Sequence, residues 1–181
     1  MSSRELTKEL YFTTSTVVDW MDIFTRPVYK HIIIDSLKYC QAEKGININA
    51  WVLMTNHLHM IIDVDHENND IGDFFRDFKK YTSKKIVDTV LNNPQESRKE
   101  WIINRCRYRG IANAKIKDYQ LWEKDNHIEV IWSYDLYIQK LIYIHMNPVV
   151  QEIVEKPENY LYSSAKDYCG EKGLIDVIVE K

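Results

Sequence analysis

Two strand-forming runs separated by a two-residue break constrain the fold of this chain more than any other feature. Residues 46–54 and 57–64 are rich in β-branched and large apolar side chains, and only Thr55 and Asn56 lie between them. Runs of this composition favour β-strands. A two-residue connection is typical of a tight hairpin, although one long, bent strand would show the same pattern. We favour the hairpin, which places an antiparallel pair of strands at the centre of the fold.

Three further segments have the features of helices. A proline opens the first and a glycine follows it, as is common at the two ends of a helix. The second repeats apolar residues at intervals of three and four. Ser133 is a suitable N-cap for the third, and Pro148 is expected to stop or kink it, because the residue before a proline avoids helical geometry. The predicted helices cover about residues 27–44, 70–91 and 134–148.

Strand-like patterns also occur at residues 10–20, 119–122 and 127–132, and the basic segment up to residue 117 is predicted to be partly helical. The resulting order of strand, helix, strand pair, helix, strand and helix predicts an α+β fold. We expect a ferredoxin-like antiparallel sheet with helices packed mainly on one face. No repeat or linker divides the sequence, so residues 1–181 are expected to form a single domain.

Cysteine usage and the N-terminal residues bear on where such a protein would be found. The three cysteines lie more than 60 residues apart, which favours neither a disulfide framework nor a zinc ribbon. The N-terminus lacks the apolar core of a signal peptide, and the longest apolar runs are too short to cross a membrane. These features predict a soluble protein of the cytoplasm.

Two histidines in the second run are candidate metal ligands. His57 and His59 are two residues apart, so on a strand their side chains point to the same face and can reach one ion. Two polar residues on a solvated strand face would give the same spacing. The apolar residues on both sides of the pair indicate a central strand instead, and a metal would need at least a third ligand.

Tyr143 and Asn147 offer a phenol and an amide in the last predicted helix. They are four residues apart, so their side chains share one helical face. The alternative is that Tyr143 is one of 12 tyrosines that serve packing, and that Asn147, which precedes a proline, is a cap or turn residue.

The two motifs together resemble those of a known family. VLMTNHLHMII and YIHMNPV, about 80 residues apart, are similar to the motifs of the HUH-type single-tyrosine transposases, in particular the REP-associated tyrosine transposases. Similarity extends over nearly the whole chain through YFTTSTVVDW, FFRDFKKYTSKK, LWEKDNH and LYSSAKDY. Two departures are visible: Thr55 stands where the family usually has proline, and the arginine that commonly follows the second motif is absent.

The resemblance implies a function for each of these residues. It makes Tyr143 the nucleophile and His57, His59 and Asn147 the ligands of a divalent metal, Mg²⁺ or Mn²⁺. The implied reaction cuts and rejoins single-stranded DNA, in hairpin-forming repeats, through a 5′-phosphotyrosine link. The protein would act as a monomer or homodimer. Two alternatives stay open: a relaxase-like or replication-initiator-like nickase, and a non-catalytic module that binds DNA hairpins.

The formal net charge of −3 conceals an uneven distribution of charge. Residues 76–117 contain 12 basic and four acidic residues, a local net charge of +8, so the rest of the chain carries −11. A basic segment with interleaved aromatic residues favours contact with phosphates and unpaired bases, although a charged helix face is often simply solvated. The predicted DNA contacts are Arg76, Lys80, Lys84, Arg105, Arg107, Tyr108 and Arg109.

Overall fold

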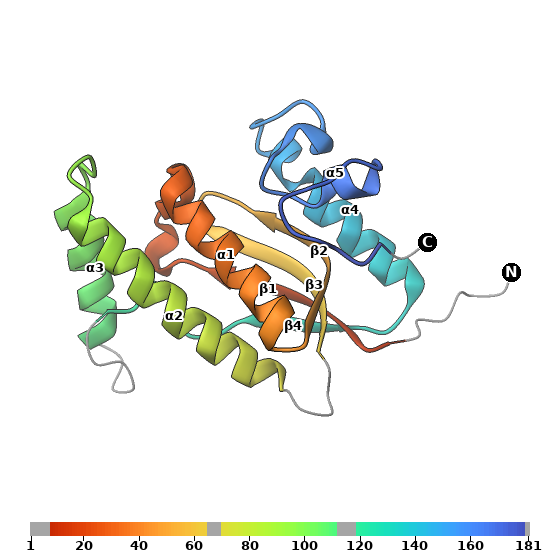
Figure 1. Ribbon diagram of the computed structural model, residues 1–181, viewed down its shortest axis with the longest axis horizontal. Helices are drawn as coiled ribbons and strands as arrows, with labels where there is room; N and C mark the ends of the chain where they lie inside the picture. Colours follow the sequence, from red (N-terminus) through yellow and green to blue (C-terminus); the bar gives the residue numbers. More distant parts are fainter. Residues whose placement is uncertain (1–7, 65–69, 112–118, 180–181) are drawn as a thin grey trace, which may run out of the picture.

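A four-stranded antiparallel sheet forms the centre of the molecule, with strands in the order β2-β3-β1-β4 (Figure 1). The computed structural model describes residues 8–64, 70–111 and 119–179. The strands are β1 (Leu10–Thr16), β2 (Ile46–Leu53), β3 (His57–Val64) and β4 (His127–Ile131). This arrangement confirms the predicted α+β class and its antiparallel sheet.

The predicted hairpin is present and forms one side of the sheet. β2 and β3 pair from Ile46 opposite Val64 to Leu53 opposite Leu58, with one irregularity between Ile48 and Ala50. All eight residues of β3 are buried. Since side chains alternate along a strand, both faces of β3 must be covered by other elements.

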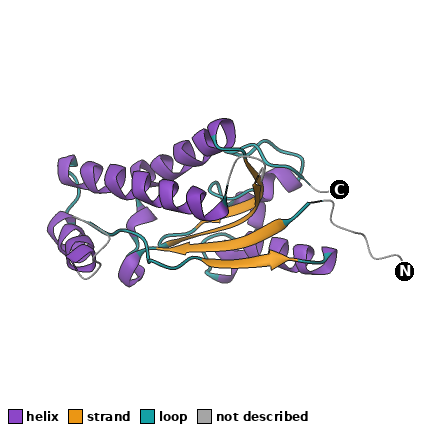
Figure 2. Cartoon of the chain, turned by 90° about the horizontal axis from the view of Figure 1, so that it is seen from below, coloured by secondary structure: helices purple, strands orange, loops and turns teal. Residues whose placement is uncertain are grey.

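Helices cover the two faces of this sheet. Helices α1 (Pro27–Glu43) and α2 (Ile71–Asn92) pack against each other over one face, and α4 (Tyr134–Val150) lies on the other (Figures 1 and 2). Phe12 and His59 share the α4 face, where both rings contact Tyr143. The sequence predicted helices mainly on one face; the structure places α4 on the other face as well, and the residues of β3 are buried on both faces.

Local signals set the ends of α1 as predicted, and the structure adds a cap at the start of α2. Pro27 occupies the first turn of α1, and Gly45, with a φ of 61°, follows its end. A left-handed backbone at this position costs glycine little. Asp70 caps α2 by accepting hydrogen bonds from the backbone N–H groups of Gly72 and Asp73.

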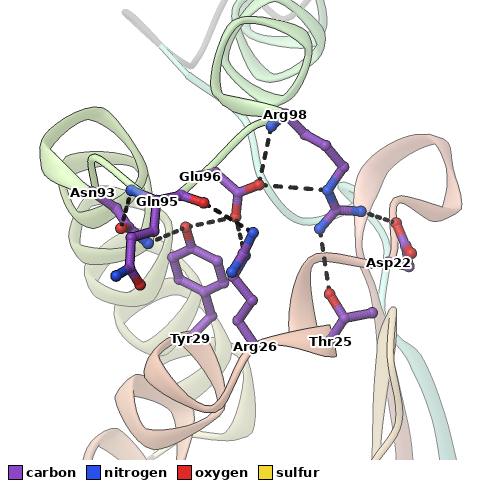
Figure 3. Close-up of polar contacts among 8 residues, drawn as sticks. All are labelled: Asp22, Thr25, Arg26, Tyr29, Asn93, Gln95, Glu96 and Arg98. Carbon is purple, nitrogen blue, oxygen red and sulfur yellow. Dashed lines mark hydrogen bonds and ion pairs between the residues drawn. The ribbon is translucent and has the colours of Figure 1, made fainter.

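A buried glutamate ties the start of α3 (Lys99–Ile111) to the start of α1 (Figure 3). The Glu96 carboxylate accepts a hydrogen bond from the Tyr29 hydroxyl at 3.0 Å and pairs with Arg26 at 2.8 Å. Arg98 pairs with it at 3.5 Å and with Asp22 at 2.7 Å. Burial alone would raise the pKa of Glu96, but the Arg98 backbone N–H, the Tyr29 hydroxyl and the two guanidinium groups lower it.

Residues 119–122 differ from the predicted strand. Only an isolated bridge between Val17 and Trp122 forms there. The Trp122 indole N–H donates to the Thr82 hydroxyl at 2.9 Å, so this segment packs against α2 through its side chains. Its strand-like composition reflects burial, since Leu121 and Trp122 are almost fully covered.

Pro148 does not stop α4, which continues to Val150. Proline has no backbone N–H, so the hydrogen bond from residue 148 to the carbonyl four residues earlier is missing in this last turn. The Gln151 N–H donates to the Asn147 carbonyl at 3.1 Å, and the Ile153 N–H donates to the Pro148 carbonyl at 2.9 Å. The last turn is therefore closed beyond the proline.

Short helical turns complete the described structure. They are η1 (Val18–Trp20), η2 (Ile23–Thr25), η3 (Pro157–Asn159) and α5 (Ala165–Tyr168). No described helix combines the length and apolar character that a membrane crossing requires.

Candidate active site

The histidine pair lies at the start of β3, on the face of the sheet that α4 covers. His57 and His59 face Thr16 and Thr14 of β1 in the strand register. Their ring centroids are 4.6 Å apart, and both side chains are buried. As the strand geometry requires, the two imidazoles project side by side.

Each imidazole has a polar partner at Nδ1. Nδ1 of His57 lies 2.6 Å from the side-chain oxygen of Asn56, and Nδ1 of His59 lies 2.8 Å from the Thr14 hydroxyl. Both contacts occupy Nδ1, so Nε2 of each ring is the nitrogen left to face other groups. Partners of this kind orient histidines that bind metals.

Burial keeps both histidines in the neutral form that a metal ligand needs. Burial lowers the pKa of His57, and a hydrogen bond with the Asn147 side chain opposes this only in part. Burial and the neighbouring His57, His127 and Lys140 lower the pKa of His59 to about 3. Neither ring therefore carries a positive charge at neutral pH.

Helix α4 brings the other two predicted residues to the pair. The Tyr143 ring lies 5.2 Å from the His59 ring and 5.9 Å from Phe12. Asn147, one turn further along, makes the hydrogen bond with His57. Tyr143 is 49% exposed although its ring contacts His59, so about half of the residue is open to solvent.

The donor set fits a divalent cation. Two neutral imidazole nitrogens and one amide come together, with a half-exposed phenol beside them. The described residues contain no group of three histidine, cysteine or acidic side chains that could hold a metal, so a third ligand here would be the amide. A mixed nitrogen and oxygen set without thiolate suits Mg²⁺ or Mn²⁺ better than a structural zinc ion.

The three predicted contacts on α2 lie apart from these four residues. Arg76, Lys80 and Lys84 are exposed on the helix that covers the opposite face of the sheet. Arg76 forms ion pairs with Asp73 and Asp77 of its own helix. Lys80 and Lys84 form no ion pair with any residue that the structure describes.

The four predicted contacts on α3 have different surroundings. Arg105 and Arg109 pair with Asp19 of η1, at 3.8 Å in the case of Arg105. Arg107 donates to the Tyr119 hydroxyl at 3.3 Å and lies over its ring. Tyr108 is 70% exposed and available for stacking. Two of the three arginines are thus already partnered by a carboxylate.

Three neighbours of the histidine pair were missed at the sequence level. Thr14 reaches His59 from β1, a contact that depends on strand register and leaves no sequence pattern. Asn56, in the turn, and Trp20, whose ring lies 6.1 Å from that of His57, complete the surroundings. Only Asn56 had a signal, because it directly precedes the first histidine.

Comparison with known proteins found a matching family model and similar solved structures. Residues 19–108 match the family model described as "Transposase IS200 like". The structure is similar to that of a REP-associated tyrosine transposase bound to a REP hairpin, with a TM-score of 0.59 and 17% identity over 100% of this chain and 93% of that one. A candidate transposase from Deinococcus radiodurans has a TM-score of 0.47 and 14% identity over 80% of this chain and 95% of that one. No curated protein matches the sequence.

Proposed function

The chain is related to the IS200-like transposases, and from this premise we propose that it cleaves and rejoins single-stranded DNA through a covalent link to Tyr143. One observation carries the proposal. Two elements distant in sequence, β3 and α4, bring Tyr143 to within 5.2 Å of His59 and hydrogen-bond Asn147 to His57. Tyr143 lies beside two neutral imidazoles and is half exposed to solvent. This placement favours a role as a nucleophile toward phosphate over a role in packing alone.

The proposed step exchanges one phosphodiester for another. The Tyr143 hydroxyl gives up its proton and its oxygen attacks a backbone phosphorus. The bond between phosphorus and the 3′ oxygen breaks, and that oxygen takes up a proton and leaves as a 3′-hydroxyl. The 5′-phosphotyrosine keeps the energy of the phosphodiester, so a DNA 3′-hydroxyl can reverse the step without ATP.

A free phenol has a pKa near ~10 and is a weak nucleophile at neutral pH, so the site must assist the attack. His57, His59 and Asn147 would hold a divalent cation, Mg²⁺ or Mn²⁺, beside the Tyr143 ring. When bound, such a cation would offset the charge that develops on the phosphate and leaving oxygens. The packing of Tyr143 against His59 and Phe12 orients the phenol for attack.

We propose a hairpin-forming single strand as the DNA partner. The REP-associated transposase with the similar fold is bound to a REP hairpin. In this chain, the exposed Lys80, Lys84 and Tyr108 are proposed to contact the backbone and unpaired bases.

Covalent trapping tests the nucleophile. A labelled hairpin oligonucleotide with single-stranded flanks, incubated with Mn²⁺, should form an adduct that survives denaturing electrophoresis. Tyr143→Phe should form none, because the attacking oxygen is lost. Tyr81→Phe is the matched control, since Tyr81 is 59% exposed on α2, and it should form the adduct at the wild-type rate. An adduct that persists in Tyr143→Phe would refute the assignment; binding without any adduct in the wild type would favour a hairpin-binding module.

Removal of one histidine separates cleavage from binding. His57→Ala should lower adduct formation at least about 100-fold, since a ligand is lost, while hairpin affinity changes less than about threefold. His31→Ala, which removes an exposed histidine on α1, is the control. Parallel loss of both activities in His57→Ala would instead show that the histidine supports the fold.

A further inference from the structure

Trp20 combines wide exposure with an unusual backbone. Its side chain is 66% exposed. Asp19 and Trp20 have φ angles of 55° and 54°, a left-handed conformation that is rare for bulky residues and costs about 1 kcal/mol or more at each. Such strain persists only where the surrounding structure holds it, so the contacts of this turn are informative.

Helix α3 holds the first of these two residues. The Asp19 carboxylate accepts a hydrogen bond from Nε of Arg109 at 2.9 Å and a second from the same guanidinium. Arg105 lies 3.8 Å from its other oxygen. The Asp19 backbone N–H lies 3.3 Å from the Glu123 carboxylate. Two arginines predicted to bind phosphate therefore fix the η1 turn.

Asn56 joins this turn to the histidine pair. Its side-chain amide donates to the Trp20 carbonyl at 3.2 Å, and its side-chain oxygen lies 2.6 Å from Nδ1 of His57. The indole ring meets the His57 ring edge to face, with centroids 6.1 Å apart. The backbone of Trp20 is therefore held by these contacts, and its indole lies at the rim of the histidine pair with most of its surface open to solvent.

We propose that Trp20 stacks on an unpaired base of the DNA strand next to the cleaved phosphate, and that Asp19 is a positioning residue for it. The proposal rests on the proposed function of the site. An aromatic face binds any base in this way, and each stacked base contributes about fivefold to 100-fold in affinity. The protein buries little of the Trp20 indole, so packing within the fold does not explain a tryptophan on this strained turn. A stacked base would cover the exposed ring.

A scan with abasic nucleotides tests the stacking. Each position of the single-stranded flank of the hairpin oligonucleotide is replaced in turn by an abasic residue, and affinity is measured by fluorescence anisotropy without metal. One or two positions should lower wild-type affinity about tenfold. Trp20→Gly removes the ring and relieves the backbone strain. It should bind the intact oligonucleotide about tenfold more weakly than the wild type does, and an abasic residue at those positions should not lower its affinity further. Trp20→Phe should restore part of the loss.

The control is Trp132→Ala. Trp132 is 80% exposed but follows Ile131, which pairs with Leu10 at the end of β1 opposite to the partner of His57. Its affinity and abasic profile should match the wild type. If Trp20→Gly retained wild-type affinity, or kept the same loss at every abasic position, the stacking would be overturned.

Asp19→Asn tests the positioning role. Asparagine tolerates the left-handed backbone but loses the ion pairs with α3. The ratio of affinities for intact and abasic oligonucleotides should fall toward one, and an unchanged ratio would overturn this role. These binding measurements do not depend on catalysis. If the wild type formed no covalent adduct, the proposed function would fail and the stacking would not be affected. If the adduct formed but the abasic scan gave the same result with and without Trp20, the stacking would fail and the proposed function would stand.

Discussion

His59 depends on a residue of a neighbouring strand for its orientation. The Thr14 hydroxyl lies 2.8 Å from Nδ1 of His59, and Thr14 and His59 face each other in the register of β1 and β3. A hydrogen bond at Nδ1 leaves Nε2 for a metal and fixes the plane of the ring. The proposed metal affinity should therefore depend on a hydroxyl that is itself no ligand.

Thr14→Val tests this dependence. Valine keeps the shape of threonine and removes only the hydroxyl. Mn²⁺ affinity should fall about tenfold to 100-fold, as it does when other metal ligands lose the residue that hydrogen-bonds to them. Titration of Mn²⁺ followed by electron paramagnetic resonance measures the affinity. Thr13→Val is the control, because Thr13 is buried on the opposite face of the same strand. Equal metal affinity of Thr14→Val and the wild type would contradict the orientation argument.

The residues of the candidate site differ in how far sequence predicts them. His57 with His59, and Tyr143 with Asn147, are spaced by the period of one strand or one helix, so each pair is visible locally. That the two pairs meet follows from packing of α4 on β3, which spacing alone does not give. Thr14 and Trp20 reach the site through contacts between distant segments, and for that reason no sequence pattern predicts them.

Among the elements, the turn between α2 and α3 depends on one buried carboxylate. The Glu96 side chain is fully buried and partnered by Arg26, Tyr29 and Arg98 (Figure 3). Glu96→Gln keeps the shape but removes the charge, so the free energy of unfolding at pH 7 should fall by about 2 kcal/mol. Urea unfolding followed by circular dichroism measures it.

The same carboxylate predicts how this difference changes with pH. The pKa of Glu96 is lowered in the folded state, so its contribution is present above the unfolded value of about 4.3 and is lost as pH falls through the folded value. The difference between wild type and Glu96→Gln should therefore shrink below about pH 4. Glu155→Gln, an exposed control, should differ little from wild type at any pH. A difference that stays constant down to pH 2 would contradict the ion-pair account.

Elements were predictable where their signals are local. Proline and glycine marked the ends of α1, and two residues between β2 and β3 marked a hairpin. Residues 119–122 were misread because burial against Thr82 of α2 selects the same side chains as a strand does. Pro148 was predicted to stop or kink the last helix, which instead continues past it for two residues, to Val150.

At the scale of the whole molecule, many basic side chains of residues 76–117 already have partners within the protein, so fewer are available to DNA than the composition indicates. Four of its five arginines pair with carboxylates: Arg76, Arg98, Arg105 and Arg109. Lys79 is partly buried and donates to the Glu123 carbonyl at 2.7 Å. Lys115 and Lys117 lie outside the described residues. The positive charge open to a phosphate within residues 76–111 is therefore well below the count of basic residues.

This distribution predicts a modest salt dependence that a few lysines dominate. Each phosphate contact contributes about 0.9 to the slope of log affinity against log salt for a duplex stem. Lys80→Gln/Lys84→Gln should lower the slope for hairpin binding by about 1.8 if both lysines contact the stem. Lys38→Gln/Lys172→Gln removes the same charge from exposed positions on α1 and the C-terminal segment, and its slope should match the wild type. Anisotropy titrations between 50 and 200 mM salt, about the range over which such slopes are measured, give both values. Equal slopes for the two double variants would place the DNA away from Lys80, Lys84 and the exposed face of α2.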